Sequence, residues 1–293
     1  MNARLLIFIA LSWPIFVFSQ LSGIDKYNIV WNSQSNNSGE SMPAGGGDIG
    51  LNVWVEKGDI LFYIAKSGTF DENNGFPKLG RVRIRFSPNP FNGKNFKQEL
   101  VLKNGYIVIY GNHEGVEAKA IIWVDVYQPV VHFDIKTTKP VKAEIYYENW
   151  RYSNHLMHDA ESFATSLKWA PFKNLVIKKD SIAFFNNGVL FFHRNTDPTV
   201  FDITVHQQFL DSVKSQLFNP LKNLTFGGFI QGQNLEPANI SSGKYLDTDF
   251  KAWQLISKKP AKEYHLEIIL HVQNAVTLDD WKKGLQKNIE NNK

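Results

Sequence analysis

Alternation of apolar and charged residues with a period of two is the feature that most constrains the fold of this chain. In residues 81–86, Val82, Ile84 and Phe86 alternate with three arginines. Because successive side chains of a strand point to opposite faces, this pattern predicts a strand with one buried face and one charged face. Further strands are expected, between short runs of Gly, Asn, Pro and Lys, at 27–31, 59–65, 98–102, 106–110, 118–126, 130–137, 141–147, 175–179, 182–185, 189–193, 226–230, 250–256 and 264–272.

These segments indicate an antiparallel all-β fold. Lys103-Asn104-Gly105 is typical of a hairpin turn, and no run of helices alternates with the strands as a parallel α/β sheet requires. One ambiguous segment starts with β-branched residues at 200–205, as in a strand, but Val205, Phe209 and Val213 have helical spacing. We therefore expect a short helix at 204–215.

The C-terminal residues 277–293 predict a second helix. Thr277 and Asp280 resemble a capping box with Asp in place of Glu or Gln, and Trp281, Leu285 and Ile289 then recur every fourth residue. An exposed apolar patch around Trp281 would indicate a missing partner.

The N-terminus resembles a secretory signal peptide. Arg4 precedes a short apolar run that ends in Val17-Phe18-Ser19, so cleavage is expected after Ser19. The run is too short to span a membrane comfortably, which predicts a secreted or periplasmic protein. With no internal repeat or low-complexity linker, residues 20–276 are expected to form one β domain.

Composition narrows the functions that the chain could have. It contains no cysteine, which excludes disulfides, thiol catalysis and cysteine zinc sites. The net charge is only +4 and the basic residues are scattered, so nucleic-acid binding gains little support. Aromatic residues make up 14% of the chain, which fits either a large β core or stacking platforms for sugar rings.

A glycine-rich segment, Gly45-Gly46-Gly47-Asp48, joins a polar loop to an apolar strand. It predicts either a tight turn closed by Asp48 or a flexible binding loop beside a rigid sheet. A phosphate-binding loop is excluded, because Lys and Ser or Thr do not follow the glycines.

Two polar segments at predicted strand ends are candidate binding residues. Trp150 and Arg151 could stack on a sugar ring and donate to its hydroxyls, or could form a cation–π pair that closes a sheet edge. His193, Arg194 and Asn195 could hold hydroxyls, or could cap neighbouring backbone.

The segment 150–173 has no clear period and is expected to be a long loop. It contains His155-x-x-His158-Asp159, a spacing weaker than that of a His-Glu-x-x-His metal helix, so neither a metal nor a cofactor is predicted. Paired carboxylates for glycoside hydrolysis are available, but their separation is not given by the sequence. They are Asp48, Asp71, Glu72, Asp159 and Glu161.

Several motifs resemble one family along nearly the whole chain after the signal peptide. They lie at 41–74, 78–84, 148–151, 192–195, 219–221 and 225–228. Together they resemble the N-terminal domain of the domain-of-unknown-function 5703 family of secreted bacterial glycoside-hydrolase-like proteins. They are more distantly similar to the N-terminal domain of family 95 fucosidases, which often carry Pro-x-Gly-Asn-Gly where this chain has Pro43-Ala44-Gly45-Gly46-Gly47.

The resemblance implies a large two-sheet β-supersandwich with a short C-terminal helix. In the related fucosidases the catalytic residues lie on an (α/α)6 barrel that follows the β domain, whereas this chain ends at Lys293. The helix 277–293 then resembles the start of a linker. The expected function is that of a non-catalytic, carbohydrate-associated domain that binds an oligosaccharide or polysaccharide, or packs against a separately encoded barrel.

The resemblance also favours a binding role for His193, Arg194 and Asn195. The predicted binding residues are thus Asp48, Trp150, Arg151, His193, Arg194 and Asn195, with no catalytic residue assigned. Two alternatives are a stand-alone glycoside hydrolase that uses carboxylates of this domain and a truncated gene product.

Overall fold

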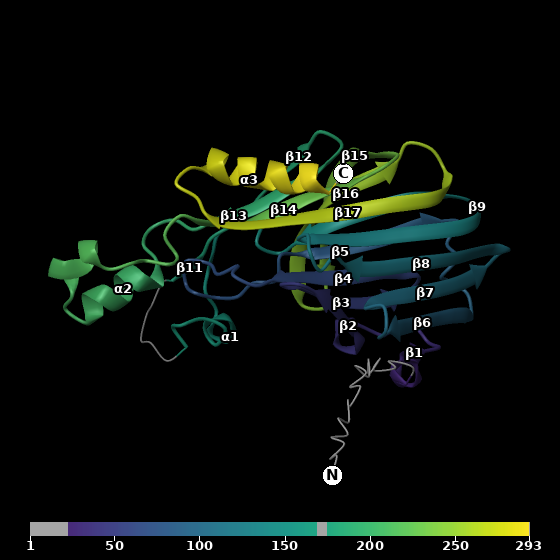
Figure 1. Ribbon diagram of the computed structural model, residues 1–293, viewed down its shortest axis with the longest axis horizontal. Coiled ribbons are helices and arrows are strands. Elements are labelled where there is room, and N and C mark those ends of the chain that lie inside the picture. The colour runs from purple at the N-terminus through teal and green to yellow at the C-terminus, as the bar shows by residue number, and fades with distance from the viewer. Residues whose placement is uncertain (1–22, 169–174, 293) are drawn as a thin grey trace, which may run out of the picture.

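The computed structural model describes residues 23–168 and 175–292, and antiparallel strands dominate it (Figure 1). The first sheet runs in the order β1 (Ile29–Trp31), β6 (Asn95–Val101), β7 (Tyr106–His113), β8 (Val116–Val124), β9 (Val130–Asn149), β17 (Ala261–Asn274), β14 (Leu224–Gly232), β13 (Gly188–Arg194) and β12 (Ser181–Phe185). The second runs in the order β2 (Met42–Gly46), β3 (Ile49–Glu56), β4 (Asp59–Lys66), β5 (Arg81–Ser87), β9, β16 (Thr248–Ser257) and β15 (Leu235–Tyr245). The predicted two-sheet, antiparallel β fold is therefore confirmed.

Strand β9 belongs to both sheets. Its first half pairs with β8 and β17, and its second half pairs with β5 and β16. The prediction of two separate strands at 130–137 and 141–147 was wrong, because Pro140 between them does not end the strand. The ladder to β17 shifts register between Ala261 and Glu263, and such a bulge accommodates the proline's missing donor. Thr137 Oγ1 donates to a backbone carbonyl at this point, that of Lys139, at 2.8 Å.

The hydrophobic core lies between the inner faces of the two sheets. Val82, Ile84 and Phe86 of β5 are buried, as the alternation predicts. Their partners in the same core cluster include Phe62, Phe133, Ile135, Tyr147, Phe226 and Leu255.

Helix α3 (Leu278–Asn291) covers part of the outer face of the first sheet (Figure 1). Thr277 is the N-cap and forms the predicted capping box with Asp280. Trp281 and Leu285 are buried against Phe229 of β14. The helix therefore presents no exposed apolar patch at Trp281.

The glycine-rich segment is a strand followed by a turn. Residues 42–46 form β2, which pairs with β3, and Gly47 adopts a positive φ of 57°. A Cβ on Gly46 would lie 2.8 Å from the carbonyl oxygen of Val124, so β2 can approach β8 only with glycine there. The segment thus contains the predicted tight turn, but the side chain of Asp48 pairs with Lys66 and not with the turn's backbone.

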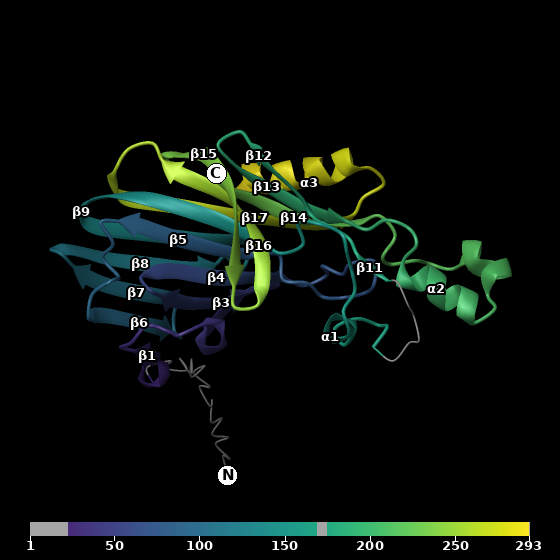
Figure 2. The same cartoon turned by 180° about the vertical axis from the view of Figure 1, so that it is seen from behind.

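Two segments form an arm beside the sandwich (Figures 1 and 2): the described residues of 150–180, and residues 195–223. The expected loop at 150–173 contains β10 (His155–Leu156), which pairs with β11 (Val176–Ile177), and α1 (Asp159–Ser162). The arm also carries α2 (Val200–Gln207) and the 3-10 helix η3 (Asp211–Gln216). Two other 3-10 turns are η1 (Ile24–Tyr27) and η2 (Ser38–Glu40).

The predicted helix at 204–215 was wrong in its bounds. Thr199 and Asp202 form a capping box that starts α2 at Val200. Phe209, with a φ of 57°, separates α2 from η3.

None of the helices in the described ranges is long and apolar enough to cross a membrane. The predicted signal peptide and its cleavage site lie outside the described residues.

Candidate functional site

The outer face of the second sheet carries a row of paired charges. Arg81, Arg83 and Arg85 project from β5, because residues two apart on a strand share a face. Arg83 donates from Nε to Glu148 at 2.6 Å and from Nη1 to Asp59 at 2.9 Å. Arg85 binds the same Asp59 at 2.8 Å, and Arg81 pairs with Glu148, its direct partner on β9. Alternating charges thus cross β4, β5 and β9.

These ion pairs fix the charges of the row. The side chains of Glu148 and Asp59 are only 2% and 7% exposed. Burial lowers the pKa of Arg83, but its contacts with Glu148 and Asp59 more than offset this, and the net pKa is raised. The row therefore consists of arginine guanidinium groups, each paired with the carboxylate of Glu148 or Asp59 or both.

An aromatic pocket of about 170 Å³ lies at one end of this row. The Arg81 guanidinium is 3.9 Å from the centroid of the Tyr245 ring, and the Lys78 ammonium is 4.0 Å from that of Tyr63. Trp150 packs edge-on against Tyr63, with 5.9 Å between ring centroids. The lining residues are Tyr63, Lys78, Arg81, Trp150, Tyr245, Leu246, Thr248 and Phe250.

The hairpin of β15 and β16 completes the pocket by reaching across the second sheet (Figure 2). The hydroxyl of Tyr245 donates to Glu56 at 2.9 Å and accepts from the backbone N–H of Ser38 at 2.9 Å. Tyr245 also borders a wider groove of about 760 Å³, whose wall includes Asp59, Arg83, Arg85, Glu144 and Lys244. We call the pocket and this groove together the outer strip. It offers aromatic faces beside planar donors and acceptors.

A second polar cluster is buried between β13 and the loop at 67–80. His193 contacts Glu72 through Nε2 at 2.8 Å and Asp180 through Nδ1 at 3.0 Å. Asp180 also accepts from Arg151 Nη2 at 2.9 Å and from Asn149 Nδ2 at 2.8 Å. All five residues are at least nine-tenths buried. We call this set the His193 network.

The electrostatics of the His193 network favour charged side chains. Burial lowers the pKa of His193, but the hydrogen bonds to Asp180 and Glu72 outweigh it and the net pKa is raised. Burial also raises the pKa of Asp180, but Arg151 and His193 together lower it below its usual value. The adjacent Asp71 has a raised pKa, chiefly because of its own burial. The carboxylates of Glu72 and Asp180 are therefore bound to internal partners.

A family model for the N-terminal part of domain of unknown function 5703 matches residues 30–293. The chain belongs to the domain-of-unknown-function 5703 family. None of the curated proteins matches it. Among solved structures, it is similar to a protein provisionally named a kojibiose phosphorylase, from the human microbiome, at 10% identity and a TM-score of 0.40. The alignment covers 90% of this chain and 35% of that one, so the chain spans about a third of its length.

In this member of the 5703 family, only one predicted binding residue faces the outer strip. Trp150 lines the aromatic pocket, whereas Arg151 points to the opposite side of the chain, into the His193 network. Asn195 is buried near that network and donates to the carbonyls of Phe70 and Leu221 at 3.0 and 3.1 Å. Trp150 and Arg151 are therefore adjacent in the sequence but contact different parts of the structure.

Arg194 and Asp48 lie elsewhere. Arg194 caps the chain before α3, donating to the carbonyls of Ala275 and Val276 at 3.0 Å. Asp48 lies in the β2–β3 turn, is half-exposed, and pairs with the buried Lys66. The structure thus brings Arg151 and His193 together at Asp180, and the other four predicted residues have different partners.

Sequence reasoning did not identify Tyr63, Tyr245 or Phe250 as site residues of this family member. They come from β4, β15 and β16, and these strands come close together only in the folded second sheet. One signal was present: the arginine alternation at 81–85 marked a charged face, and Glu148 precedes Trp150 by two residues on that same face.

Proposed function

We propose that this chain is a secreted, carbohydrate-associated β domain that binds saccharide in the outer strip. It would correspond to the N-terminal β domain of a glycoside-hydrolase-like protein. The observation that carries the proposal is the continuity of an aromatic pocket with a groove of fixed charges, both bordered by Tyr245. Membership of the 5703 family is shown by the family model, and the sequence motifs that resemble this family link it to glycoside-hydrolase-like proteins.

The side chains of the outer strip are chemically complementary to a sugar. A pyranose ring has an apolar C–H face, which packs on aromatic rings, and an edge of hydroxyls, which need planar donors and acceptors. Trp150, Tyr63 and Tyr245 are half-buried, so each ring keeps one part accessible and another part packed. Arg83, Arg85 and Asp59 are already oriented by their ion pairs, which lowers the entropic cost of binding a ligand.

Calorimetric titration of residues 20–293 with fucosylated and galactosylated oligosaccharides tests this proposal. We expect saturable binding that Trp150→Ala and Tyr245→Ala weaken at least about fivefold, since each removes a stacking contact worth about 1 kcal/mol or more. Tyr127→Ala is the matched control, because Tyr127 is an aromatic residue that is 91% exposed and does not line the outer strip. Equal loss in all three variants, or none in the first two, would refute the outer strip as the site.

Reducing-sugar release from the same samples distinguishes the alternative of a stand-alone glycoside hydrolase. Binding without release supports a binding domain. Release that disappears in Asp48→Asn or Asp159→Asn would assign the chain an enzymatic activity instead. We expect no release, because Glu72 and Asp180 are buried and bound to His193.

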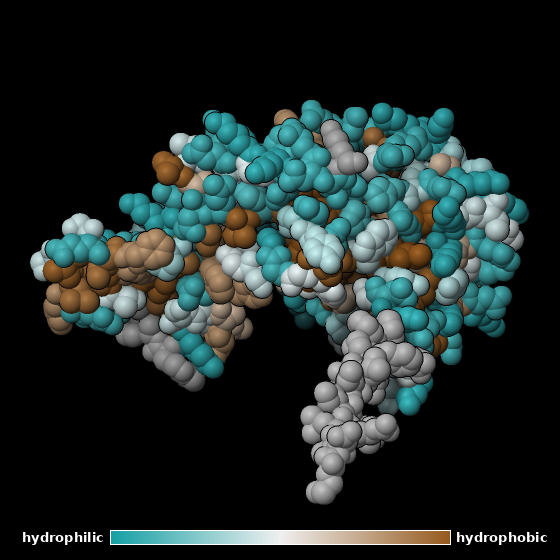
Figure 3. Space-filling model, viewed as in Figure 1, coloured by the Kyte–Doolittle hydropathy of each residue, from teal (hydrophilic) through white to brown (hydrophobic). Residues whose placement is uncertain are grey.

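A second candidate function is packing against a separately encoded helical barrel. The arm carries an apolar surface (Figure 3), on which Phe209 and Phe218 are 92% and 81% exposed. Phe218 also lines a groove of about 690 Å³ with Phe201, Leu217 and Val276. Exposed apolar surface of this kind commonly marks a protein interface.

Co-elution with a separately encoded helical barrel protein tests that candidate. Phe209→Ser with Phe218→Ser should abolish co-elution, and Tyr127→Ser should leave it unchanged. Co-elution that survives loss of both phenylalanines would exclude the arm as the interface.

A further inference from the structure

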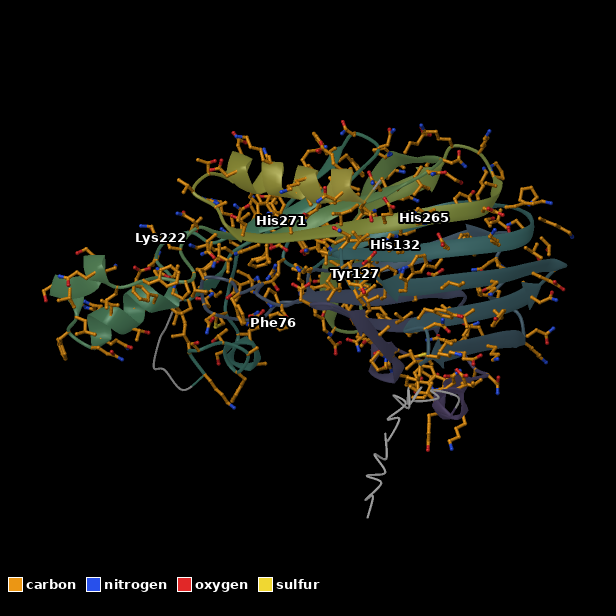
Figure 4. All side chains as sticks on the ribbon, in the orientation of Figure 1. Phe76, Tyr127, His132, Lys222, His265 and His271 are labelled. Atoms are coloured by element: carbon orange, nitrogen blue, oxygen red, sulfur yellow. The ribbon has the colours of Figure 1, made fainter. Side chains whose placement is uncertain are left out.

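Three potential metal ligands lie together on the outer face of the first sheet, away from the outer strip. They are His132 of β9 and His265 and Glu267 of β17, and their ligand atoms lie within 4.8 Å of one another. His132 and Glu267 are direct cross-strand partners, and His265 is two residues from Glu267 on the same face. Figure 4 shows His132 and His265 on these neighbouring strands.

One ring nitrogen of His132 is buried without a hydrogen-bond partner in the part of the chain that the structure describes. Its Nδ1 is buried and, among the described residues, makes no hydrogen bond, while the whole residue is 9% exposed. Its ring stacks on Trp123 at 4.8 Å and 14°, which fixes the ring plane. A buried, unpaired imidazole nitrogen is uncommon and requires an explanation such as a bound ion.

His265 has the orientation of a metal-binding histidine. Its Nδ1 contacts the carboxylate of Asp134, and its Nε2 lies 3.0 Å from Glu267 Oε1. A carboxylate on the far ring nitrogen is the usual partner of a ligating histidine, because it fixes the tautomer and the ring orientation.

Glu267 is likewise oriented by outer partners. Gln231 donates to Oε2 and Asn292 donates to Oε1, both at 2.9 Å. His265 and Glu267 also line a cavity of about 580 Å³ together with Gln231 and Asn292. A small ligand or water in this cavity could reach an ion held between the three side chains.

We propose that His132, His265 and Glu267 form a site for a divalent transition metal, with Zn²⁺ as the best match. The ion would take the place of the proton between His265 and Glu267 and would bind the free nitrogen of His132. Two imidazoles and one carboxylate suit Zn²⁺ better than Ca²⁺ or Mg²⁺, which prefer oxygen ligands. Zinc–ligand distances of about 2.0–2.2 Å require the three side chains to close by roughly 1 Å.

Titration of chelator-treated residues 20–293 with Zn²⁺ alone tests the site. We expect one equivalent to bind, and His132→Ala and Glu267→Gln to weaken binding at least about tenfold. Asp134→Asn should weaken it about ten- to hundredfold without removing a ligand, since it frees the ring of His265. With Co²⁺ in place of Zn²⁺, the same variants should lose the visible absorption of a low-coordinate site.

His206→Ala is the matched control. His206 lies 3.0 Å from Asp211 on the arm, and this exposed histidine–carboxylate pair belongs to no three-ligand group among the residues that the structure describes. Circular dichroism and thermal unfolding establish that each variant is folded. Absence of saturable Zn²⁺ binding by the unmodified chain, or equal binding by the His132→Ala and His206→Ala variants, would overturn the proposal.

Discussion

The Nε2 atom of His193 lies 2.8 Å from Oε2 of Glu72, across 121 positions of sequence. The other ring nitrogen contacts Asp180, so one buried imidazole lies between two buried carboxylates. This contact attaches the loop at 67–80 to β13. The network therefore fixes the position of the loop at this end of the sandwich.

The stability of the chain should depend on pH through His193. Its folded-state pKa is raised, so its contribution to the free energy of unfolding is complete below the unfolded pKa of about 6.5 and is lost as pH rises through the folded pKa. Urea unfolding at about pH 6 and about pH 9 measures this. The difference between the unmodified chain and His193→Gln should be larger at the lower pH. A difference that does not change with pH would mean that the imidazole is neutral in the folded state.

Glu148→Gln should destabilise the fold by about 3–5 kcal/mol, because Arg81 and Arg83 would lose the buried carboxylate that they share. Denaturant unfolding measures the change. Glu263→Gln is the matched control. Its pair with Lys136 is 66% and 75% exposed and should be worth less than about 1 kcal/mol. Similar losses in both variants would contradict the difference in burial.

Gly80→Ala should destabilise the fold by roughly 2–4 kcal/mol. Gly80 has a φ of 124°, and a Cβ there would lie 2.6 Å from the ring of Tyr147. That ring is held by a hydrogen bond from its hydroxyl to the Leu79 carbonyl at 2.5 Å. Thermal unfolding compares this variant with Gly50→Ala, which meets no atom within 4 Å and should change stability by no more than about 0.5 kcal/mol. Tolerance of both substitutions would show that Tyr147 can move.

Thr277→Ala should cost about 1 kcal/mol and increase hydrogen exchange in the first turn of α3, because the Asp280 amide loses its acceptor. Thr277→Ser retains that oxygen and should behave like the unmodified chain. Exchange that rises equally in both variants would assign the effect to the lost methyl group.

The sequence predicted the elements whose pattern is local. The β5 alternation and the Thr277 capping box depend on residues a few positions apart, and both are present. Strand β15 was not predicted, because most of its residues are exposed or half-exposed and no apolar face alternates along it. Strand β9 was divided in two because the bulge opposite Pro140 is formed by β17, more than a hundred residues away.

The candidate sites depend still more on distant partners. Trp150 was predicted to bind, and its three aromatic neighbours come from strands that are remote in sequence. Arg151 and His193 were selected as surface donors. Their actual partner Asp180 lies in the loop between β11 and β12, and carries no motif that would mark it. The local sequence pattern predicts which residues form a strand. The order of the strands in the sheets determines which side chains come into contact.

The position of β9 also sets the order in which this protein can fold. Its neighbours β16 and β17 span residues 248–257 and 261–274, close to the C-terminal end of the described chain. A ribosome synthesises β16 and β17 after β9, so until then β9 can pair only with β5 and β8, which precede it. Pairing between strands far apart in the sequence slows folding, and the strands made first have unpaired edges until their partners are synthesised. In the nascent chain, β9 therefore gains its partners β16 and β17 only after residue 274 has been synthesised.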